Sequence, residues 1–327
     1  MDAGIYAEGI RKKYKEVEAL RGVSLAAPQG TVLGVLGPNG AGKTTMVRIL
    51  STLLEPDAGR VSVAGCDVVR QPNEVRKRIG LAGQYAAVDP LLTGRENLEL
   101  AGRLYHLGRS GARRKADELL QRFGLADAAD RPSMTYSGGM RRRLDLAASL
   151  IPRPAVIFLD EPTTGLDPAS RLALWDMVRE QVADGATVLL TTQYLEEAEQ
   201  LAHRIAVING GEVIAEGTSD ELKQRVGGER LEVTLVDAAG TQYAADLLAQ
   251  ALGQQPTAGE DGRSLSVPLA GAMLEALARA AQVLQDAQIQ VTDLAIRRPS
   301  LDDVFLTLTG AGAAAPAAAT AGAVSAA

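Results

Sequence analysis

The stretch that most constrains this chain of 327 residues is Gly37-Pro38-Asn39-Gly40-Ala41-Gly42-Lys43-Thr44. It follows the pattern G-x-x-x-x-G-K-T, in which glycines let backbone N–H groups converge on a phosphate chain. The apolar run 31–36 before it is typical of a buried parallel strand, and the mostly apolar segment 45–50 after it predicts a helix. Because that helix would place its positive end at the loop, the stretch predicts a binding site for a nucleoside triphosphate.

Two acidic residues follow a second apolar strand and complete the chemistry that such a site needs. Residues 156–160 read Val-Ile-Phe-Leu-Asp, and Glu161 comes next. Acids at a strand end are ordinary by themselves, but beside a phosphate-binding loop they predict roles. Asp160 would hold Mg²⁺ together with the Thr44 hydroxyl, and Glu161 would polarise a water for attack on the γ-phosphate. Lys43 would reach the β- and γ-phosphates.

Composition excludes several classes of protein. The net charge of −6 argues against a nucleic-acid binder that depends on phosphate contacts. A single cysteine, Cys66, allows no internal disulfide and fits a reducing compartment. We expect no signal peptide, since residues 1–8 lack an apolar core, and no apolar run approaches the ~20 residues that span a bilayer. Any action at a membrane would then require a partner.

The order of the remaining patterns predicts an α/β fold with a mostly parallel sheet. We expect a nucleotide-binding domain over residues 1–227, with antiparallel β structure near its start and a helical subdomain at about 88–152. That subdomain begins at the capping box formed by Thr93 and Glu96. A small α+β domain is expected over 228–309, with strands at 231–236, 265–267 and 289–291 and helices at 273–285 and 301–308. The alanine-rich segment 310–327 predicts a disordered tail.

A second helix start also looks suited to an anion. Ser137-Gly138-Gly139-Met140 precedes an amphipathic helix, so that Ser137 can cap it while the glycine N–H groups stay open. Three arginines, 141–143, follow in the first turn, where cations oppose the helix dipole. We interpret them as a sign that an anion docks there. One nucleotide could use both helix starts if these came from two molecules facing head to tail.

With these motifs in place, the chain resembles the nucleotide-binding subunit of ABC transporters over residues 5–225. Residues 37–44 match Walker A, 156–161 match Walker B with its catalytic acid, 136–140 match the signature motif and 165–167 match the D-loop. Residues 298–306 resemble the C-terminal end of daunorubicin-resistance-type drug-exporter ATPases. The resemblance implies catalytic roles for Glu161, Gln193 and Lys43 and metal ligation by Thr44, Gln84 and Asp160. It implies nucleotide contacts from Tyr14, Gly37, Pro38, Asn39, Gly40, Ala41, Gly42, Lys43, Thr44, Thr45, Gln84, Ser137, Gly138, Gly139 and Asp167.

Two departures from the family pattern stand out. Tyr136 and Met140 replace the usual outer residues of the signature, which leaves Ser137 and the glycines in place. Gln193 stands where most members carry a switch histidine, as we expect in the drug-resistance branch. A glutamine takes up no proton near neutral pH, but its amide can contact the γ-phosphate or orient a water, as in some GTPases.

The resemblance implies an ATPase that uses ATP and Mg²⁺ to power an exporter of a hydrophobic drug or antibiotic, with a lipid or glycolipid as the next choice of cargo. Its partners would be a second copy of the chain and a multi-span membrane permease, which would hold it on the cytoplasmic face of the membrane. A soluble ABC-type ATPase and an ATP-dependent regulatory module remain alternatives. A P-loop kinase is disfavoured, because it would leave Ser137–Gly139 and residues 165–167 unexplained.

Overall fold

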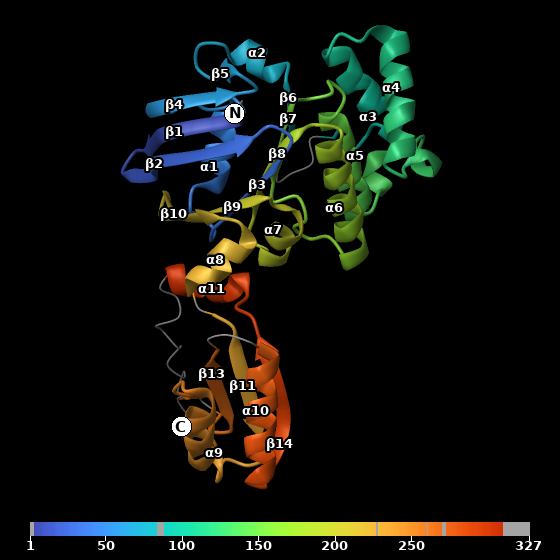
Figure 1. The fold of residues 1–327 in the computed structure, drawn as a ribbon. Helices are drawn as coiled ribbons and strands as arrows, with labels where there is room; N and C mark the ends of the chain where they lie inside the picture. Colours follow the sequence, from blue (N-terminus) through green and yellow to red (C-terminus); the bar gives the residue numbers. More distant parts are fainter. Residues whose placement is uncertain (1–2, 84–87, 227, 260, 270–272, 310–327) are drawn as a thin grey trace, which may run out of the picture. The chain divides into compact units, whose positions relative to one another are not determined.

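The computed structural model describes residues 3–83, 88–226, 228–259, 261–269 and 273–309 (Figure 1). The chain divides into two compact units, Met1–Ser219 and Asp220–Ala327. The first unit contains two sheets and two hydrophobic clusters, and the second contains one of each, so each unit is described by itself. In the described part of the chain, no helix combines the length and apolarity needed to cross a membrane.

A six-stranded sheet forms the centre of the first unit. Its strands lie in the order β10 (Glu212–Gly217), β9 (Arg204–Asn209), β3 (Val32–Leu36), β8 (Thr187–Thr192), β7 (Val156–Asp160) and β6 (Ile79–Ala82). All neighbouring pairs are parallel except β9 with β10. The α/β class with a mostly parallel sheet is therefore confirmed, whereas β10 was not predicted. Because β3, β7 and β8 are parallel, their carboxyl ends carry the phosphate-binding loop, Asp160–Glu161 and Gln193 to one edge.

One face of this sheet packs against an antiparallel sheet and helix α1 (Lys43–Leu50). The antiparallel sheet has the order β2 (Val17–Pro28), β1 (Ala3–Tyr14), β4 (Ala58–Val63) and β5 (Cys66–Asp67), and α2 (Pro72–Arg76) follows it. Alternate residues of the central strands, such as Leu33 and Phe158, join α1 and the antiparallel strands in one core. The short strand runs are buried on both faces, as parallel strands require.

The other face of the sheet is covered by helices. Alternate residues Val32, Ile157 and Leu190 pack with α5 (Gly138–Ser149), α6 (Pro168–Ala183) and the helical subdomain. That subdomain contains α3 (Gly94–Leu104) and α4 (Gly108–Arg122), which lie beside α5 at the right of Figure 1. The capping box predicted at Thr93 and Glu96 is present. Helix α7 (Leu195–Leu201) follows β8 and contacts β3.

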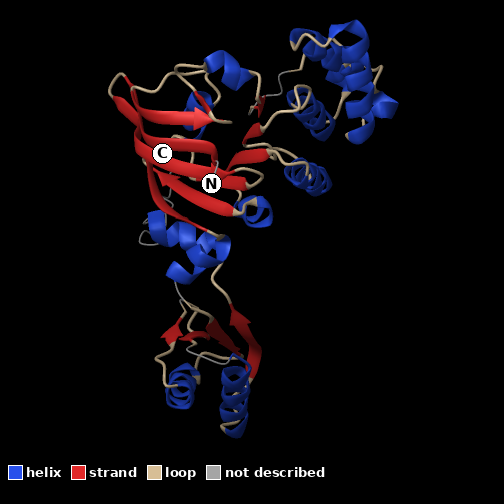
Figure 2. Ribbon diagram, turned by 45° about the horizontal axis from the view of Figure 1, so that its top comes forward, coloured by secondary structure: helices blue, strands red, loops and turns tan. Residues whose placement is uncertain are grey.

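The second unit has a four-stranded antiparallel sheet with two helices on one face (Figure 2). The strand order is β12 (Thr257–Ala258), β13 (Ser264–Pro268), β11 (Arg230–Leu235) and β14 (Val291–Arg297). Helices α9 (Thr241–Leu252) and α10 (Met273–Asp286) bury Leu248 and Leu284 against it, while α8 (Ser219–Val226) and α11 (Leu301–Thr309) flank these elements in sequence. Helix α9 was not predicted, and the last strand starts at Val291 rather than Ile289, because pairing with β11 begins only there.

Candidate nucleotide-binding site

The glycine-rich loop joins β3 to α1 and can take its shape only because key positions lack a side chain. Gly40 and Gly42 have φ of 81° and 107°, values that disfavour other residues. A Cβ on Gly42 would lie 2.6 Å from the carbonyl oxygen of Ala19, and one on Gly37 would collide with the carbonyl of Ile208. Helix α1 has no side-chain cap and no acid in its first turn. Its N–H groups and dipole are therefore open to an anion.

Lys43 is buried at this helix start and already has partners. Its Nζ donates to the carbonyl oxygens of Gly37 at 2.8 Å and Pro38 at 3.3 Å. It also lies 3.2 Å from Glu161 Oε1, although the two side chains are only 4% and 10% exposed. The predicted phosphate-binding cation and the predicted general base thus form a buried ion pair in this structure.

Asp160 and Thr44 bring two oxygen ligands together at the carboxyl end of β7. Asp160 Oδ1 accepts from Thr191 Oγ1 at 2.5 Å and from Thr44 Oγ1 at 3.4 Å. Glu161, the next residue, adopts a left-handed φ of 50°. Its N–H donates to the Thr191 carbonyl at 3.0 Å and to Thr191 Oγ1 at 3.1 Å. One threonine on β8 therefore fixes both acids relative to the sheet.

A cavity of about 360 Å³ lies over this cluster. Gln193 lines it together with Glu161, although Gln193 comes from the end of β8 and is exposed. The other residues that line it are Ala19, Pro38, Asn39, Gly40, Gly42, Lys43, Thr44, Thr45 and Thr164. The phosphate-binding loop, Glu161 and Gln193, which the sequence predicts to act on one nucleotide, therefore line the same cavity.

The Ser137 helix start lies at a second cavity, which shares Glu161 and Thr164 with the first. Ser137 caps α5 by accepting from Met140 N at 3.2 Å, while Gly138 lines this second cavity, of about 160 Å³. Gly139 packs so closely on Ser170 that a Cβ would collide with the serine hydroxyl. Ser170 is in turn held by Asp167, which caps α6 and accepts from Ser170 Oγ at 2.6 Å and from its N–H at 3.0 Å. These hydrogen bonds keep the pKa of Asp167 below its usual value.

Comparison with known proteins decides the family. The model of the ABC transporter family matches residues 20–164, and the model of the C-terminal domain of DrrA1-3-like ATP-binding proteins matches residues 217–309. The daunorubicin resistance ATP-binding protein DrrA3 of Streptomyces coeruleorubidus is 59% identical over 309 residues, which cover 94% of this chain and 96% of that protein. The chain belongs to the ABC transporter ATP-binding proteins.

Two further similarities agree with this assignment. The daunorubicin/doxorubicin resistance ATP-binding protein DrrA of Streptomyces peucetius is 50% identical over 310 residues, covering 94% of this chain and 92% of that protein. A solved ATP-binding cassette, a dimer in a post-hydrolysis state bound to ADP and phosphate, is 28% identical with a TM-score of 0.61. It covers 65% of this chain and 98% of its own. As an ABC transporter subunit, the protein binds and hydrolyses ATP.

Not every ABC motif residue lies at the cavity. Tyr14 lies at the end of β1, 42% exposed, and does not line it, whereas Ala19 does. Gly37 and Ala41 do not line the cavity; Ala41 is buried, and a Cβ on Gly37 would meet it. Asp160 does not line the cavity either, but it accepts a hydrogen bond from Thr44, which does. Gln84 falls outside the described residues.

Arg142 corrects the interpretation of the three arginines. Its guanidinium is buried and donates to the Pro162 carbonyl at 2.8 Å, to the Asp160 carbonyl at 3.4 Å and to the Gly83 carbonyl, and it pairs with Asp145 at 3.2 Å. Burial lowers its pKa. Arg143 donates to the Phe123 carbonyl at 3.0 Å, so only Arg141 of the three is exposed. Arg142 therefore fixes the backbone that follows β7. The only sequence signal for this role is a positive charge in the first turn of a helix, where cations oppose the helix dipole.

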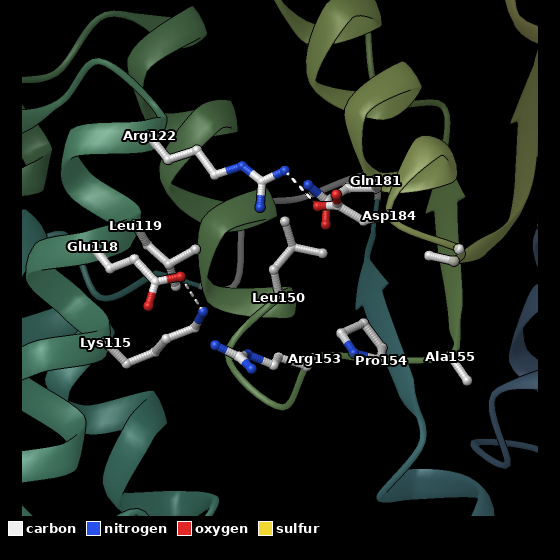
Figure 3. Close-up of a pocket in the computed structure, with 12 residues that line it drawn as sticks. Lys115, Glu118, Leu119, Arg122, Leu150, Arg153, Pro154, Ala155, Gln181 and Asp184 are labelled. Atoms are coloured by element: carbon white, nitrogen blue, oxygen red, sulfur yellow. Dashed lines mark hydrogen bonds and ion pairs between the residues drawn. The ribbon is translucent and has the colours of Figure 1, made fainter.

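A different cavity, of about 530 Å³, lies at the opposite edge of the sheet (Figure 3). Pro154 and Ala155 line it just before β7, so it opens at the amino ends of the parallel strands. Two of its cations already have partners, since Lys115 pairs with Glu118 at 2.6 Å and Arg122 with Asp184 at 2.8 Å. Ligands of open α/β sheets bind at the carboxyl ends, so this cavity is not the nucleotide site.

Proposed function

We propose that the protein powers export of a hydrophobic drug through a separate membrane-spanning subunit, working as a head-to-tail dimer that closes around two ATP molecules. The observation that carries the dimer is that the two anion-ready helix starts line different cavities, although Glu161 and Thr164 line both. The loop before α1 lines one cavity and Gly138 another, so a single chain supplies two different halves of a site. Such pairing is isologous and closes with two-fold symmetry. The solved dimeric cassette and the names of the drug-resistance relatives support it.

The residues present fit a magnesium ion. Mg²⁺ prefers oxygen ligands and is usually held by one or two protein groups plus phosphates and waters. The Thr44 hydroxyl and the Asp160 carboxylate lie together beside the cavity and match that requirement. Among the described residues, no group of three or more His, Cys, Asp or Glu side chains is arranged as a metal site, so the ion would depend on the nucleotide. When bound, it would neutralise charge on the phosphates.

The Lys43–Glu161 pair suggests how binding prepares hydrolysis. A γ-phosphate that forms an ion pair with Lys43 removes the counter-ion of Glu161. The Glu161 carboxylate is then free to accept a hydrogen bond from a water. Glu161 would accept the proton of that water as it attacks, while the Gln193 amide, which lines the same cavity, orients the water or contacts the γ-phosphate. Hydrolysis would remove the γ-phosphate contacts and reopen the dimer.

Changing Glu161 to Gln tests the general base and the dimer together. We expect turnover to fall by about 100-fold or more, because general-base catalysis contributes ~10²–10⁴-fold. We also expect a stable dimer to accumulate with ATP and Mg²⁺. Phosphate release and light scattering measure the two effects. Glu212→Gln, the same change at an exposed position on β10, should alter neither. Persistent turnover without a dimer would show that Glu161 is not the base.

Export itself requires the membrane partner. The chain would be purified from its source membranes with the multi-span protein that accompanies it, and the complex placed in vesicles. We expect ATP-dependent uptake of daunorubicin, followed by its fluorescence, that disappears with Glu161→Gln. If turnover continues and no membrane protein accompanies the chain, the soluble ATPase alternative replaces the transport proposal.

A further inference from the structure

Glu197 on α7 is a fully buried carboxyl group with no ordinary hydrogen bond. Its exposed fraction is 0%, and neither Oε1 nor Oε2 has a direct hydrogen-bond partner. A buried carboxylate without partners is unfavourable, so a group that keeps this position in a fold has either a neutral form or a specific function.

Helix α7, which carries this carboxyl group, contacts β8 and α6, and side chains from three segments lie next to the carboxyl group. Thr192 comes from the end of β8, directly before Gln193, and Thr163 comes from the loop after β7, two residues past Glu161. Trp175 comes from α6, which begins at the Asp167 cap. Thr163 Oγ1 and Trp175 Nε1 are themselves buried without direct partners. The carboxyl group of Glu197 is thus the polar group that these orphaned donors share.

The charges that face Glu197 do not compensate it. Burial raises its pKa above the ordinary 4.5, and the hydroxyls, the indole and Arg171 on α6 oppose this only in part. Arg171 lies 3.7 Å from Glu196 and stacks on Tyr194, while Arg142 on α5 is engaged with Asp145 and backbone carbonyls. The neutral acid, which can both donate and accept a hydrogen bond, is the form that suits this place.

We propose that Glu197 is a positioning residue of the ATPase, whose carboxyl group is joined to Thr192 and Thr163 through buried water and thereby sets the position of Gln193 relative to Glu161. The inference rests on the proposed roles of those two residues. Glu197 is fully buried and does not line the nucleotide cavity. Its effect should therefore appear in the chemical step and pass through Gln193.

A double-mutant cycle tests this pathway. Glu197→Met fills the same space without a polar group, and we expect it to lower kcat about tenfold, since small misplacements of catalytic groups have large effects on rate. The Kd of a non-hydrolysable ATP analogue, measured by calorimetry, should stay within twofold of the wild-type value. In a Gln193→Ala background, Glu197→Met should change kcat by less than twofold. Glu197→Gln, which keeps a donor and an acceptor, should restore kcat to within twofold of wild type.

The controls separate this inference from the proposed function. Glu199→Gln makes the same change at an exposed position of α7 and should have no effect. If Glu197→Met keeps the wild-type kcat, or lowers it equally in both backgrounds, Glu197 does not position Gln193. If wild type hydrolyses no ATP, the proposed function fails instead. If Glu197→Met does not fold, Glu197→Asp replaces it, because its side chain is shorter by one methylene group and moves the carboxyl group away. The same double-mutant cycle with Gln193→Ala is then measured, with the same expected outcomes.

Discussion

Individual residues of the site owe their positions to contacts between distant strands. Thr191 on β8 bonds to Asp160 and to the backbone of Glu161 on β7, and the left-handed φ of Glu161 turns its side chain to Lys43. The sequence predicts which residue types meet, because the loop and the strand-end acids follow local patterns. It does not predict the roles of Arg142 or Glu197, since the groups around them are backbone carbonyls or buried side chains from separate segments that no spacing rule connects.

The buried acid gives stability a specific dependence on pH. Because the folded-state pKa of Glu197 lies above its unfolded value near 4.5, the folded state holds a proton that the unfolded state has lost. The free energy of unfolding should therefore fall as pH rises above about 4.5, by up to about 1.4 kcal/mol per pH unit, until the folded-state pKa is reached. Urea unfolding at pH 5, 6 and 7 should show wild type losing stability relative to Glu197→Gln. Parallel curves for the two proteins would refute this, and Glu199→Gln should follow wild type.

Among helices and strands, local sequence signals predict where an element begins better than they predict which other elements it contacts. The capping box at Thr93 and Glu96 is confirmed because both hydrogen bonds lie within one turn. Helix α9 was missed because only Ala244 and Leu248 of its twelve residues are buried, which leaves a weak apolar pattern. The contact of α3 with the signature segment was also unpredictable. Tyr136 donates to the Ala128 carbonyl at 2.6 Å and leaves no room for a side chain at Gly94.

Gly94 and Tyr136 should therefore be energetically coupled. A Cβ at Gly94 would collide with the Tyr136 hydroxyl, so Gly94→Ala should cost about 1–3 kcal/mol, as overpacking does. In Tyr136→Phe, which removes that hydroxyl at a cost of about 1 kcal/mol, the same alanine should cost much less. Chemical denaturation measures the cycle. Gly111→Ala on α4 meets only an ordinary contact at 3.4 Å and should stabilise by up to ~1 kcal/mol. Additive losses would contradict the coupling.

For the whole molecule, separate cores imply separate unfolding. The core of the first unit holds the only tryptophan of the chain, Trp175, while the core of the second unit is built around Leu231, Leu248 and Leu284. The change of pattern past residue 228 predicts a second domain from sequence. The pairing of β11 with both β13 and β14 could not be predicted, because antiparallel register depends on contacts between residues that lie 30 to 67 positions apart, from Thr234↔Ser264 to Arg230↔Arg297.

Two spectroscopic probes should consequently disagree. Tryptophan fluorescence reports only the first unit, whereas far-UV circular dichroism reports both, so their urea transitions should not coincide. Leu248→Ala should shift the dichroism transition and leave that of fluorescence unchanged, with a loss of about 2–5 kcal/mol in the second unit. Leu144→Ala in the first core should shift the fluorescence transition and also the part of the dichroism change that the first unit contributes. Coincident transitions that both respond to Leu248→Ala would show one cooperative unit.

The ion pair between Lys43 and Glu161 also affects which anions bind to the site. Any anion that takes up Lys43 leaves a buried carboxylate without its counter-ion, and that penalty is the same for a small anion as for a large one. Free phosphate or sulfate has only the lysine and a few amides to offset it. A nucleoside triphosphate spreads its contacts along the whole loop. The Lys43–Glu161 pair therefore disfavours the binding of abundant small anions relative to that of a nucleoside triphosphate.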